Sequence, residues 1–438
     1  MKKSYLMIAA AAALLAACSS KDAFKEVVNE NETDLIGFST YHGKATKAAV
    51  NAPVDLLLAN GGFGVYGYKH SDNLTASNGT ISMASNTSKV FDNVQVWYVD
   101  DNTPTQGFTY AVPKYWDKPK YYTFFAYAPY AAKAEGNTKG ISFAEGTGLF
   151  TRNDVQSLQS TNATTTVTVG NNSRTQYTTA NEASVVDYLI APYVPSMKYG
   201  ATNQPKGSTD YTGSNQTVGF TFYHIMSKFN VTVKAKDETS DATDNPTGHN
   251  YKGIKDIQIS KLNIENLPNV SQDVTYTQTS VESTSGTVPT ATFTPNKYST
   301  VLEIVSGTNP LAAGPLYILD GGSENNGTIT NPTNYIDQTF HYFIAPNTPQ
   351  ETTTGDGHGA YKLNIDYTVT YVDNTVEPYT RSIDLSKAAN LSNNSATLTK
   401  MEQNNIYNVI VTIGLDQIYF TVDEVKPWIT NTDTEVDL

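Results

Sequence analysis

The chain has 438 residues, one cysteine and a formal net charge of −13 at pH 7. A single cysteine excludes disulfides and thiolate metal sites from the folded body, and the acidic balance argues against nucleic acid or an anionic lipid surface as the partner. The length allows two domains that each bury a core. Abundant Tyr, Phe and Thr, interrupted by Gly, Asn and Pro, predict an all-β fold of many short strands.

The N-terminus has the pattern of a secretory signal for lipid attachment. Lys2 and Lys3 precede an uncharged apolar run that ends at Cys18, and this run is too short to span a bilayer stably. The small residues before Cys18 resemble a bacterial lipobox, in which the thiol receives diacylglycerol. The alternative is an ordinary signal peptide in which the cysteine is incidental. We expect residues 1–17 to be removed, Cys18 to be lipidated, and residues 18–33 to form a polar tether.

A first strand is expected directly after the tether. Residues 35–41 alternate, and Ile36 and Phe38 share the parity that we expect to face the core. Two basic residues, Lys44 and Lys47, follow closely. Burial of Ile36 and Phe38 would hold this strand in place as long as the chain after it is intact.

Residues 62–67 match a dinucleotide-binding glycine pattern on paper. That fingerprint needs a preceding strand and a helix N-terminus after it to hold pyrophosphate. Here Val65, Tyr66 and Tyr68 lie in a run that itself reads as a strand. We therefore expect a strand at this position and no cofactor.

An aromatic segment, residues 115–129, has two interpretations. Its rings could offer a stacking platform to a glycan, or they could form a core strand that ends at Pro129. We favour the core strand, because rings on both parities suit a sheet that is covered on both faces.

A strand around His224 changes parity. Apolar residues occupy even positions from 218 to 226 and odd positions from 229 to 235, so we expect a β-bulge or kink near Ser227 and Lys228. His224 lies on the buried parity. We expect it to be a core histidine that a backbone carbonyl satisfies, not a catalytic group.

Two domains are expected, over residues 34–200 and 216–438, with a polar linker between them and a second polar tract at 236–250. Near the C-terminus, alternation over 407–413 changes parity at 418–422, which predicts a hairpin turn at 414–417. The histidines are scattered without zinc-ligand spacing, and no nucleophile elbow or phosphate loop is present. We therefore expect no catalytic residue, metal or cofactor, and no enzyme.

Five segments, in this order behind the lipobox, resemble the landmarks of fimbrillin-like (type V pilin) surface lipoproteins. They are residues 63–67 (FGVYG), 115–129 (YW followed by YTFFAYAP), 187–191 (DYLIA), 222–229 (FYHIMSKF) and 425–428 (VKPW). The resemblance implies two transthyretin-like antiparallel β-sandwich domains, export as a lipoprotein to the outer membrane and cell surface, and assembly with other pilin subunits into a fimbrium.

The resemblance also implies a mechanism. A trypsin-like protease removes the N-terminal strand, here the one with Ile36 and Phe38, and the vacated groove accepts a C-terminal strand of another subunit. The family usually has arginine at the cleaved bond, and this chain has Lys47 and Lys44 there. The candidate donor residues are Ile418, Phe420, Val422 and Trp428.

The expected function is therefore cell attachment and fimbrial assembly, with a receptor on a host or bacterial surface as a further partner. The alternative is a glycan-binding surface lipoprotein of a nutrient-uptake system, which would share the lipid, the β-sandwiches and the aromatic content. An exposed aromatic platform would favour the alternative. A covered aromatic segment and a releasable first strand would favour the pilin.

Overall fold

The structure is a computed structural model. It describes residues 35–41, 61–71, 83, 87–99, 107–135, 138–156, 158–160, 162–169, 172–179, 186–199, 217–236, 254–277, 290–305, 316–320, 338–346, 360–371, 373–386, 398–414, 418–422 and 426–427.

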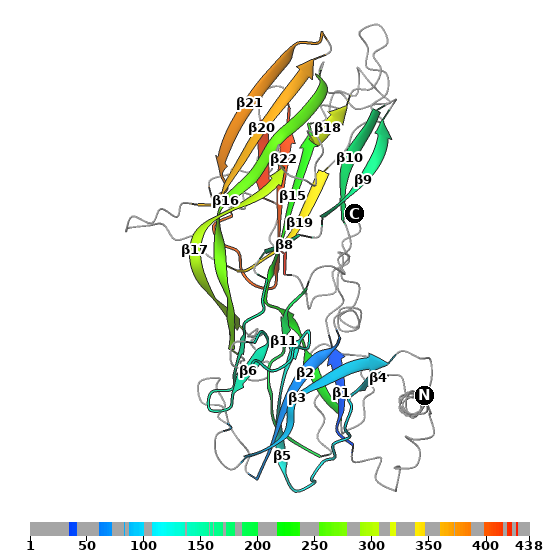
Figure 1. Ribbon diagram of the computed structural model, residues 1–438, viewed down its shortest axis with the longest axis vertical. Helices are drawn as coiled ribbons and strands as arrows, with labels where there is room; N and C mark the ends of the chain where they lie inside the picture. The colour runs from blue at the N-terminus through cyan, green and yellow to red at the C-terminus, as the bar shows by residue number, and fades with distance from the viewer. Residues whose placement is uncertain are drawn as a thin grey trace, which may run out of the picture.

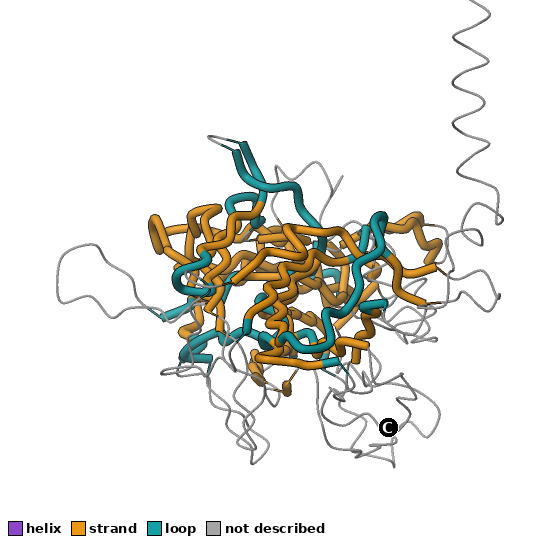
Figure 2. Tube along the Cα trace, turned by 90° about the horizontal axis from the view of Figure 1, so that it is seen from below, coloured by secondary structure: helices purple, strands orange, loops and turns teal. Residues whose placement is uncertain are grey.

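These residues form strands and connections, with no helix among them, so the predicted all-β class is confirmed (Figures 1 and 2). Over the described part of the chain, no helix long and apolar enough to cross a membrane is found.

The N-terminal part is built on one seven-stranded sheet. Its strands, in spatial order, are β14 (Tyr223–His224), β11 (Leu189–Ile190), β5 (Tyr121–Ala128), β2 (Phe63–His70), β3 (Thr87–Val99) and β4 (Gly107–Thr109), with β12 (Val194–Lys198) also on β5. On one face lies a two-stranded sheet of β1 (Gly37–Tyr41) and β13 (Thr217–Thr221), which run parallel. The other face packs against β6 (Ile141–Ala144) and β7 (Leu149–Arg152).

Burial on both faces explains the composition of β5. Phe124 and Ala126 belong to the core under β1 and β13, whereas Phe125 and Tyr127 belong to the core toward β6 and β7. The prediction of a core strand in this aromatic segment is confirmed, and β5 ends at Ala128, directly before Pro129.

The C-terminal part is a sandwich of two sheets, with six and seven strands. The first contains β23 (Ile418–Val422), β22 (Asn405–Ile413), β15 (Ser227–Ala235), β19 (Gln338–Ile344) and β8 (Leu158–Ser160), with β24 (Lys426–Pro427) on β22. The second contains β21 (Val376–Asp384), β20 (Lys362–Tyr371), β16 (Ile254–Thr277), β7 and β6, with β17 (Thr290–Val305) and β18 (Leu316–Asp320) also on β16. A separate hairpin pairs β9 (Asn162–Val169) with β10 (Asn172–Thr179).

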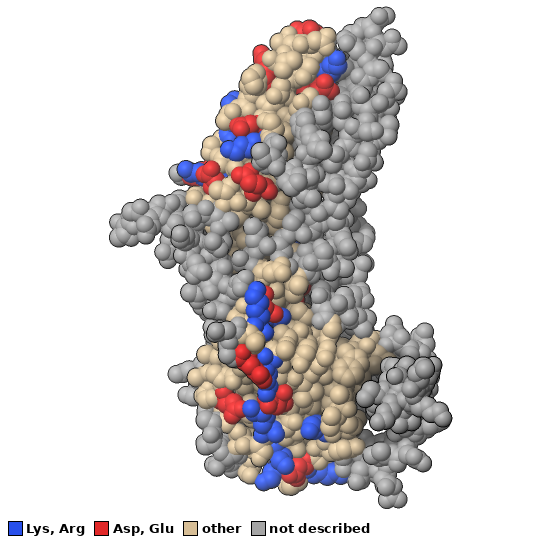
Figure 3. Space-filling model, viewed as in Figure 1, with Lys and Arg blue, Asp and Glu red and all other residues tan. Residues whose placement is uncertain are grey.

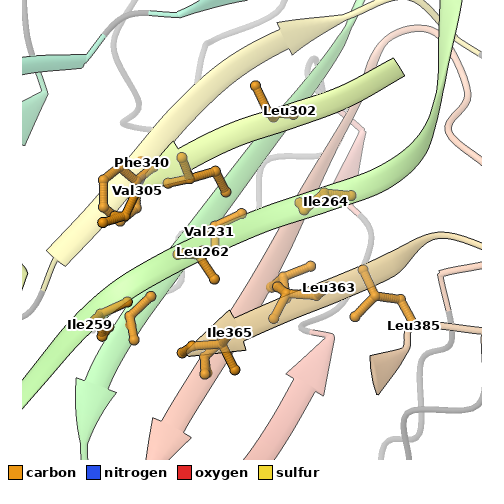
Figure 4. Close-up of a cluster of buried hydrophobic side chains, with 14 of the residues drawn as sticks. Val231, Ile259, Leu262, Ile264, Leu302, Val305, Phe340, Leu363, Ile365 and Leu385 are labelled. Carbon is orange, nitrogen blue, oxygen red and sulfur yellow. The ribbon is translucent and has the colours of Figure 1, made fainter. Parts of the chain in front are cut away.

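Aliphatic side chains from both sheets fill the C-terminal core. In β20 the alternate residues Leu363, Ile365, Tyr367 and Val369 are buried, and the residues between them are partly or fully exposed. Figure 4 shows side chains of β15, β16, β17, β19 and β20 meeting in this core. Period-two burial thus sets which face of each strand is inward.

The two parts are joined by shared strands as well as by the chain. β16 is long enough to pair with β20 over its N-terminal half, from Ile254 to Glu265, and with β7 at its C-terminal end, where Tyr276 lies opposite Phe150. Figure 1 shows it running from the upper sheets to the level of β6. β6, β7 and β8 come from residues within the range expected for the first domain, yet they join the C-terminal sheets. The domain limits 34–200 and 216–438 stay a prediction.

Two details differ from the sequence-based expectation. The parity change after His224 is a break between β14 and β15, where the chain passes from the N-terminal sheet to the C-terminal one, and not a bulge within one strand. Two strand pairs are parallel: β1 with β13, which form a sheet of their own, and β15 with β22, within an otherwise antiparallel sheet. The hairpin expected at 414–417 is confirmed by antiparallel pairing of Ile413 with Ile418.

Candidate functional site

The candidate site is the groove that holds the first strand. β1 pairs in parallel with β13 from Gly37, opposite Thr217, to Tyr41, opposite Thr221. Just before β1, the Ile36 backbone N–H donates a hydrogen bond of 2.9 Å to the Lys114 carbonyl. The Tyr110 hydroxyl donates to the Ile36 carbonyl at 2.7 Å. The strand is therefore held by backbone contacts on both of its sides.

Ile36 and Phe38 fill this groove as their alternation predicts, with 0% and 5% of each residue exposed. We call the five rings around Phe38 the aromatic groove. Its members, with their ring-centroid distances to Phe38, are Phe91 (5.2 Å), Tyr110 (5.6 Å), Phe220 (6.0 Å), Phe124 (6.1 Å) and Phe63 (6.4 Å). These rings come from β2, β3, β5, β13 and the connection after β4, so the first strand ties five segments together.

β13 depends on β1 for its strand pairing. Among the described residues, β1 is the only strand that pairs with β13, because the two form a sheet of their own. Loss of β1 would leave one edge of β13 unpaired beside an apolar trough lined by Val218 and Phe220. Unpaired backbone over apolar surface is the arrangement that an added strand satisfies, since the strand supplies both hydrogen bonds and side chains.

The free energy gained by burying Ile36 and Phe38 sets how strongly β1 is held in the groove. Burying Ile36 and Phe38 contributes roughly 1.5 to 3 kcal/mol each. Edge-to-face aromatic pairs add about 0.5 to 1.5 kcal/mol beyond burial. Burial on this scale favours retention of β1 in the groove of the intact chain.

Tyr110 secures the start of the strand over the whole physiological pH range. Burial raises its pKa to about 12, so the hydroxyl stays protonated and able to donate to the Ile36 carbonyl. Sequence reasoning missed Tyr110, because it lies outside any strand and nothing in its neighbours marks it as buried.

Close packing explains the glycine pattern at 62–67. Gly62 has φ +84°, and a Cβ there would lie 2.0 Å from the Val96 carbonyl oxygen. A Cβ on Gly64 would lie 2.4 Å from the Tyr127 ring. These glycines admit a neighbouring backbone and a ring inside a sheet, and the strand predicted here in place of a cofactor loop is confirmed as β2.

His224 is buried where β14 meets β11, as its parity predicts. His224 Nδ1 lies 2.6 Å from the Asp187 Oδ2 atom, so a buried carboxylate is one of its neighbours; the expected backbone carbonyl stays a prediction. Nearby, the buried Arg152 donates to the Pro129 carbonyl at 2.8 Å and to Asp154 Oδ1 at 2.5 Å. Asp187 falls in a loop ahead of β11, a position that gives no sequence signal of burial.

Of the other predicted site residues, some lie within the described part of the chain and some do not. Cys18, Lys44, Lys47 and Trp428 lie outside the described residues. Ile418, Phe420 and Val422 lie in β23, which pairs with β22 of its own chain at the edge of the sheet. No group of His, Cys, Asp and Glu that could hold a metal ion occurs among the residues that the structure describes.

The aromatic segment offers little to a stacking ligand. Every residue of β5 after Tyr121 is buried, and Trp116 is buried against Tyr122 and Phe124. Of the large apolar residues that the structure describes as exposed, Tyr115 is the only aromatic one, with 49% of its surface exposed.

Comparison with known proteins gives matches to solved structures at low sequence identity and low TM-score. No family model matches the chain, and no curated protein matches it. A fimbrial protein from Bacteroides vulgatus is similar, with 18% identity and a TM-score of 0.42 over 90% of this chain and 99% of that chain. A fimbrial assembly protein from Parabacteroides distasonis has 12% identity and a TM-score of 0.29 over 89% and 96% of the two chains.

The C-terminally truncated tip fimbrial protein Mfa3 from Porphyromonas gingivalis is also similar, with 9% identity and a TM-score of 0.26 over 85% of this chain and 97% of that chain. These structures are of fimbrial proteins, the class that the sequence landmarks resemble. No residue role transfers from them at this level of similarity.

Proposed function

We propose that this chain is a fimbrial subunit or a related surface adhesin that joins its neighbours by exchange of strands. The observation that carries the proposal is the position of β1: it is the only strand partner of β13 in the described part of the chain, and its Phe38 ring fills the aromatic groove. Two lysines follow it in the sequence, Lys44 and Lys47, at three and six residues after its last residue.

Cleavage at these lysines is the proposed trigger. Before cleavage β1 is part of the domain and competes at very high effective concentration for its own groove. After cleavage it is held only by its burial and its ladder to β13, and a strand from another subunit can replace it.

The proposed donor is the C-terminal region. Ile418, Phe420 and Val422 repeat at every second residue, as Ile36 and Phe38 do, so their spacing fits the same groove. β23 lies at the edge of its sheet and pairs only with β22 among the described strands, so its departure breaks one ladder. Trp428 would extend the donor beyond β24.

We further propose that the protein reaches the surface as a lipoprotein, with diacylglycerol on Cys18 and with the outer membrane and fimbrium as its locations. Its partners would be other subunits and a surface receptor.

Low-dose trypsin tests the exchange. Purified protein should lose its N-terminal strand, begin at Ala48 or Ala45 on N-terminal sequencing, and form ladders in electrophoresis without boiling. Lys44→Gln combined with Lys47→Gln should prevent both results. Lys139→Gln is the matched control, because Lys139 is exposed and lies in a connection elsewhere in the N-terminal part.

Cleavage and ladder formation are scored separately. Replacement of Phe420 by Asp should stop ladders while leaving cleavage intact. Ladders without cleavage, or cleavage without any self-association at high protein concentration, would reject strand exchange. Such a result would favour the glycan-binding alternative, which titration with surface polysaccharides would test.

A further inference from the structure

One end of the N-terminal sheet is basic, although the chain as a whole is acidic. Lysines gather where β5 begins and where β2 and β12 end, and we call this group the basic end. It consists of Lys69, Lys114, Lys118, Lys120 and Lys198. Asp117 is the only carboxylate among the described residues of the same three segments, residues 69–71, 111–121 and 198–199, and it lies 3.2 Å from Lys69 Nζ. Figure 3 shows blue side chains at the lower end of the molecule, with few red ones beside them.

Contacts with neighbours fix these lysines at the surface. Lys198 Nζ lies 4.1 Å from the centre of the Tyr121 ring, and Lys118 Nζ lies 4.7 Å from that of Tyr199. Lys120 Nζ donates to Ser71 Oγ at 2.8 Å. Lys118 and Lys198 are exposed, and the other three are partly exposed.

Charge is divided unevenly along the chain. Residues 216–438 contain 12 Lys and Arg against 25 Asp and Glu, which accounts for the whole net charge of −13. Residues 1–215 contain 17 of each kind. The net charge that argued against an anionic lipid partner therefore belongs to the C-terminal part and does not describe the basic end.

Exposed apolar side chains accompany the lysines. Val112 is 61% exposed and Tyr115 is 49% exposed, and both lie in the connection that also carries Lys114, Lys118 and Lys120. Leu35, the first described residue, is 39% exposed and forms a backbone bridge with Tyr115. Lysines around exposed apolar side chains are the composition of surfaces that rest on anionic lipid headgroups.

We propose that the basic end is a membrane-contact face, which rests on anionic lipid headgroups while the C-terminal part points away from the bilayer. This inference rests on the proposed lipid attachment at Cys18 and applies as long as β1 is retained.

The position of the tether favours a lipid surface over other anions. The chain enters the described fold at Leu35, beside Tyr115, so a lipid on Cys18 would be connected to the basic end itself. The 16 residues from 19 to 34 span at most about 50 to 60 Å when fully extended. A tether of this reach keeps the lysines close to the headgroups, and the acidic C-terminal part is repelled from the same surface.

Vesicle binding of protein without its lipid tests this face separately from lipidation. Residues 19–438 would be sedimented with vesicles of pure phosphatidylcholine and with an equal mixture of phosphatidylcholine and phosphatidylglycerol. We expect binding to the mixture only, and loss of that binding at high salt. The test variant replaces four lysines by glutamine: Lys114, Lys118, Lys120 and Lys198.

The matched control removes the same charge from the C-terminal part by replacing Lys255, Lys261, Lys362 and Lys400 with glutamine. The test variant should weaken binding on the order of a hundredfold, and the control should bind as the wild type does. Val112→Ser, at a side chain with few contacts, should weaken binding severalfold without lowering the melting temperature.

Three outcomes would overturn the proposal: no binding to the anionic vesicles, equal binding to both kinds, or equal loss in test and control variants. Self-association in solution that only the test variant abolishes, without vesicle binding, would assign the basic end to the acidic surface of a second copy instead. Failure of lipidation would appear separately, as absence of fatty-acid label on the full-length protein in cells.

Discussion

Truncation of Phe38 to alanine tests the central role of the first strand. The side chain is 5% exposed and its ring lies within 6.4 Å of five others, which belong to separate segments and cannot all move inward to fill the space. Phe→Ala in a core costs about 3 to 5 kcal/mol, and a site that collapses poorly falls in the upper part of that range. We therefore expect Phe38→Ala to lower the free energy of unfolding by about 4 kcal/mol.

Two measurements separate a loosened first strand from a general loss of stability. Denaturant unfolding gives the total change, and hydrogen exchange on peptides that cover 217–224 reports on β13, whose only described strand partner is β1. Leu35→Ala is the control, because Leu35 is 39% exposed and should cost less than about 1 kcal/mol. A Phe38 variant that behaves like the Leu35 variant, with unchanged exchange in β13, would refute the assigned role of the groove.

Three further predictions rest on contacts in the structure, and a fourth rests on the sequence around Cys18. Gly64→Ala places a Cβ 2.4 Å from the Tyr127 ring and should destabilise by about 1 to 3 kcal/mol in thermal melts, whereas Gly146→Ala, with open space around it, should be close to neutral. His224→Gln should lower stability by about 1 to 3 kcal/mol, because it removes the contact with the buried Asp187; unchanged melting with selective loss of a bound ligand would show a binding role instead. Burial, with Lys228 nearby, lowers the pKa of His341 to about 4. Because an unfolded histidine has a pKa of about 6.5, the unfolded chain binds more protons between these two values, and the free energy of unfolding should fall as the pH drops from about 6.5 to about 4. In denaturation experiments at several pH values, His341→Gln should flatten this slope relative to the wild type. Cys18→Ala should abolish incorporation of labelled fatty acid in cells, and equal labelling of the variant would contradict lipid attachment at this residue.

The sequence alone predicted the features that depend on local periodicity. Alternation placed Ile36 and Phe38 inward, rings on both parities predicted that β5 is covered on both faces, and the parity change after 413 located the hairpin. These predictions are confirmed because side chains of a strand point to opposite faces in strict alternation, so the pattern of polarity carries the burial of each face.

The sequence could not supply the pairing of distant segments. β1 and β13 lie far apart in the chain, and nothing in residues 35–41 indicates a parallel partner at 217–221. In the same way, the position of His224 indicated burial but not the carboxylate of Asp187 as its partner. The parity change near Ser227 predicts a β-bulge or kink, and the structure shows that it marks the passage of the chain from one sheet to another.

The basic end shows the same division between local pattern and assembly. Each lysine is visible in the sequence, yet Lys69, Lys118 and Lys198 come together only because β2 and β12 both end beside the first residue of β5. The net charge is a sum over the whole chain, so it does not show where on the surface the basic residues lie. Alternation and composition therefore determined the all-β class and the inward faces of the strands, because these depend on neighbours in sequence. Tertiary structure decided which strands share the aromatic groove and which charges share a surface, because long-range pairing is chosen by packing summed over segments that are distant in the chain.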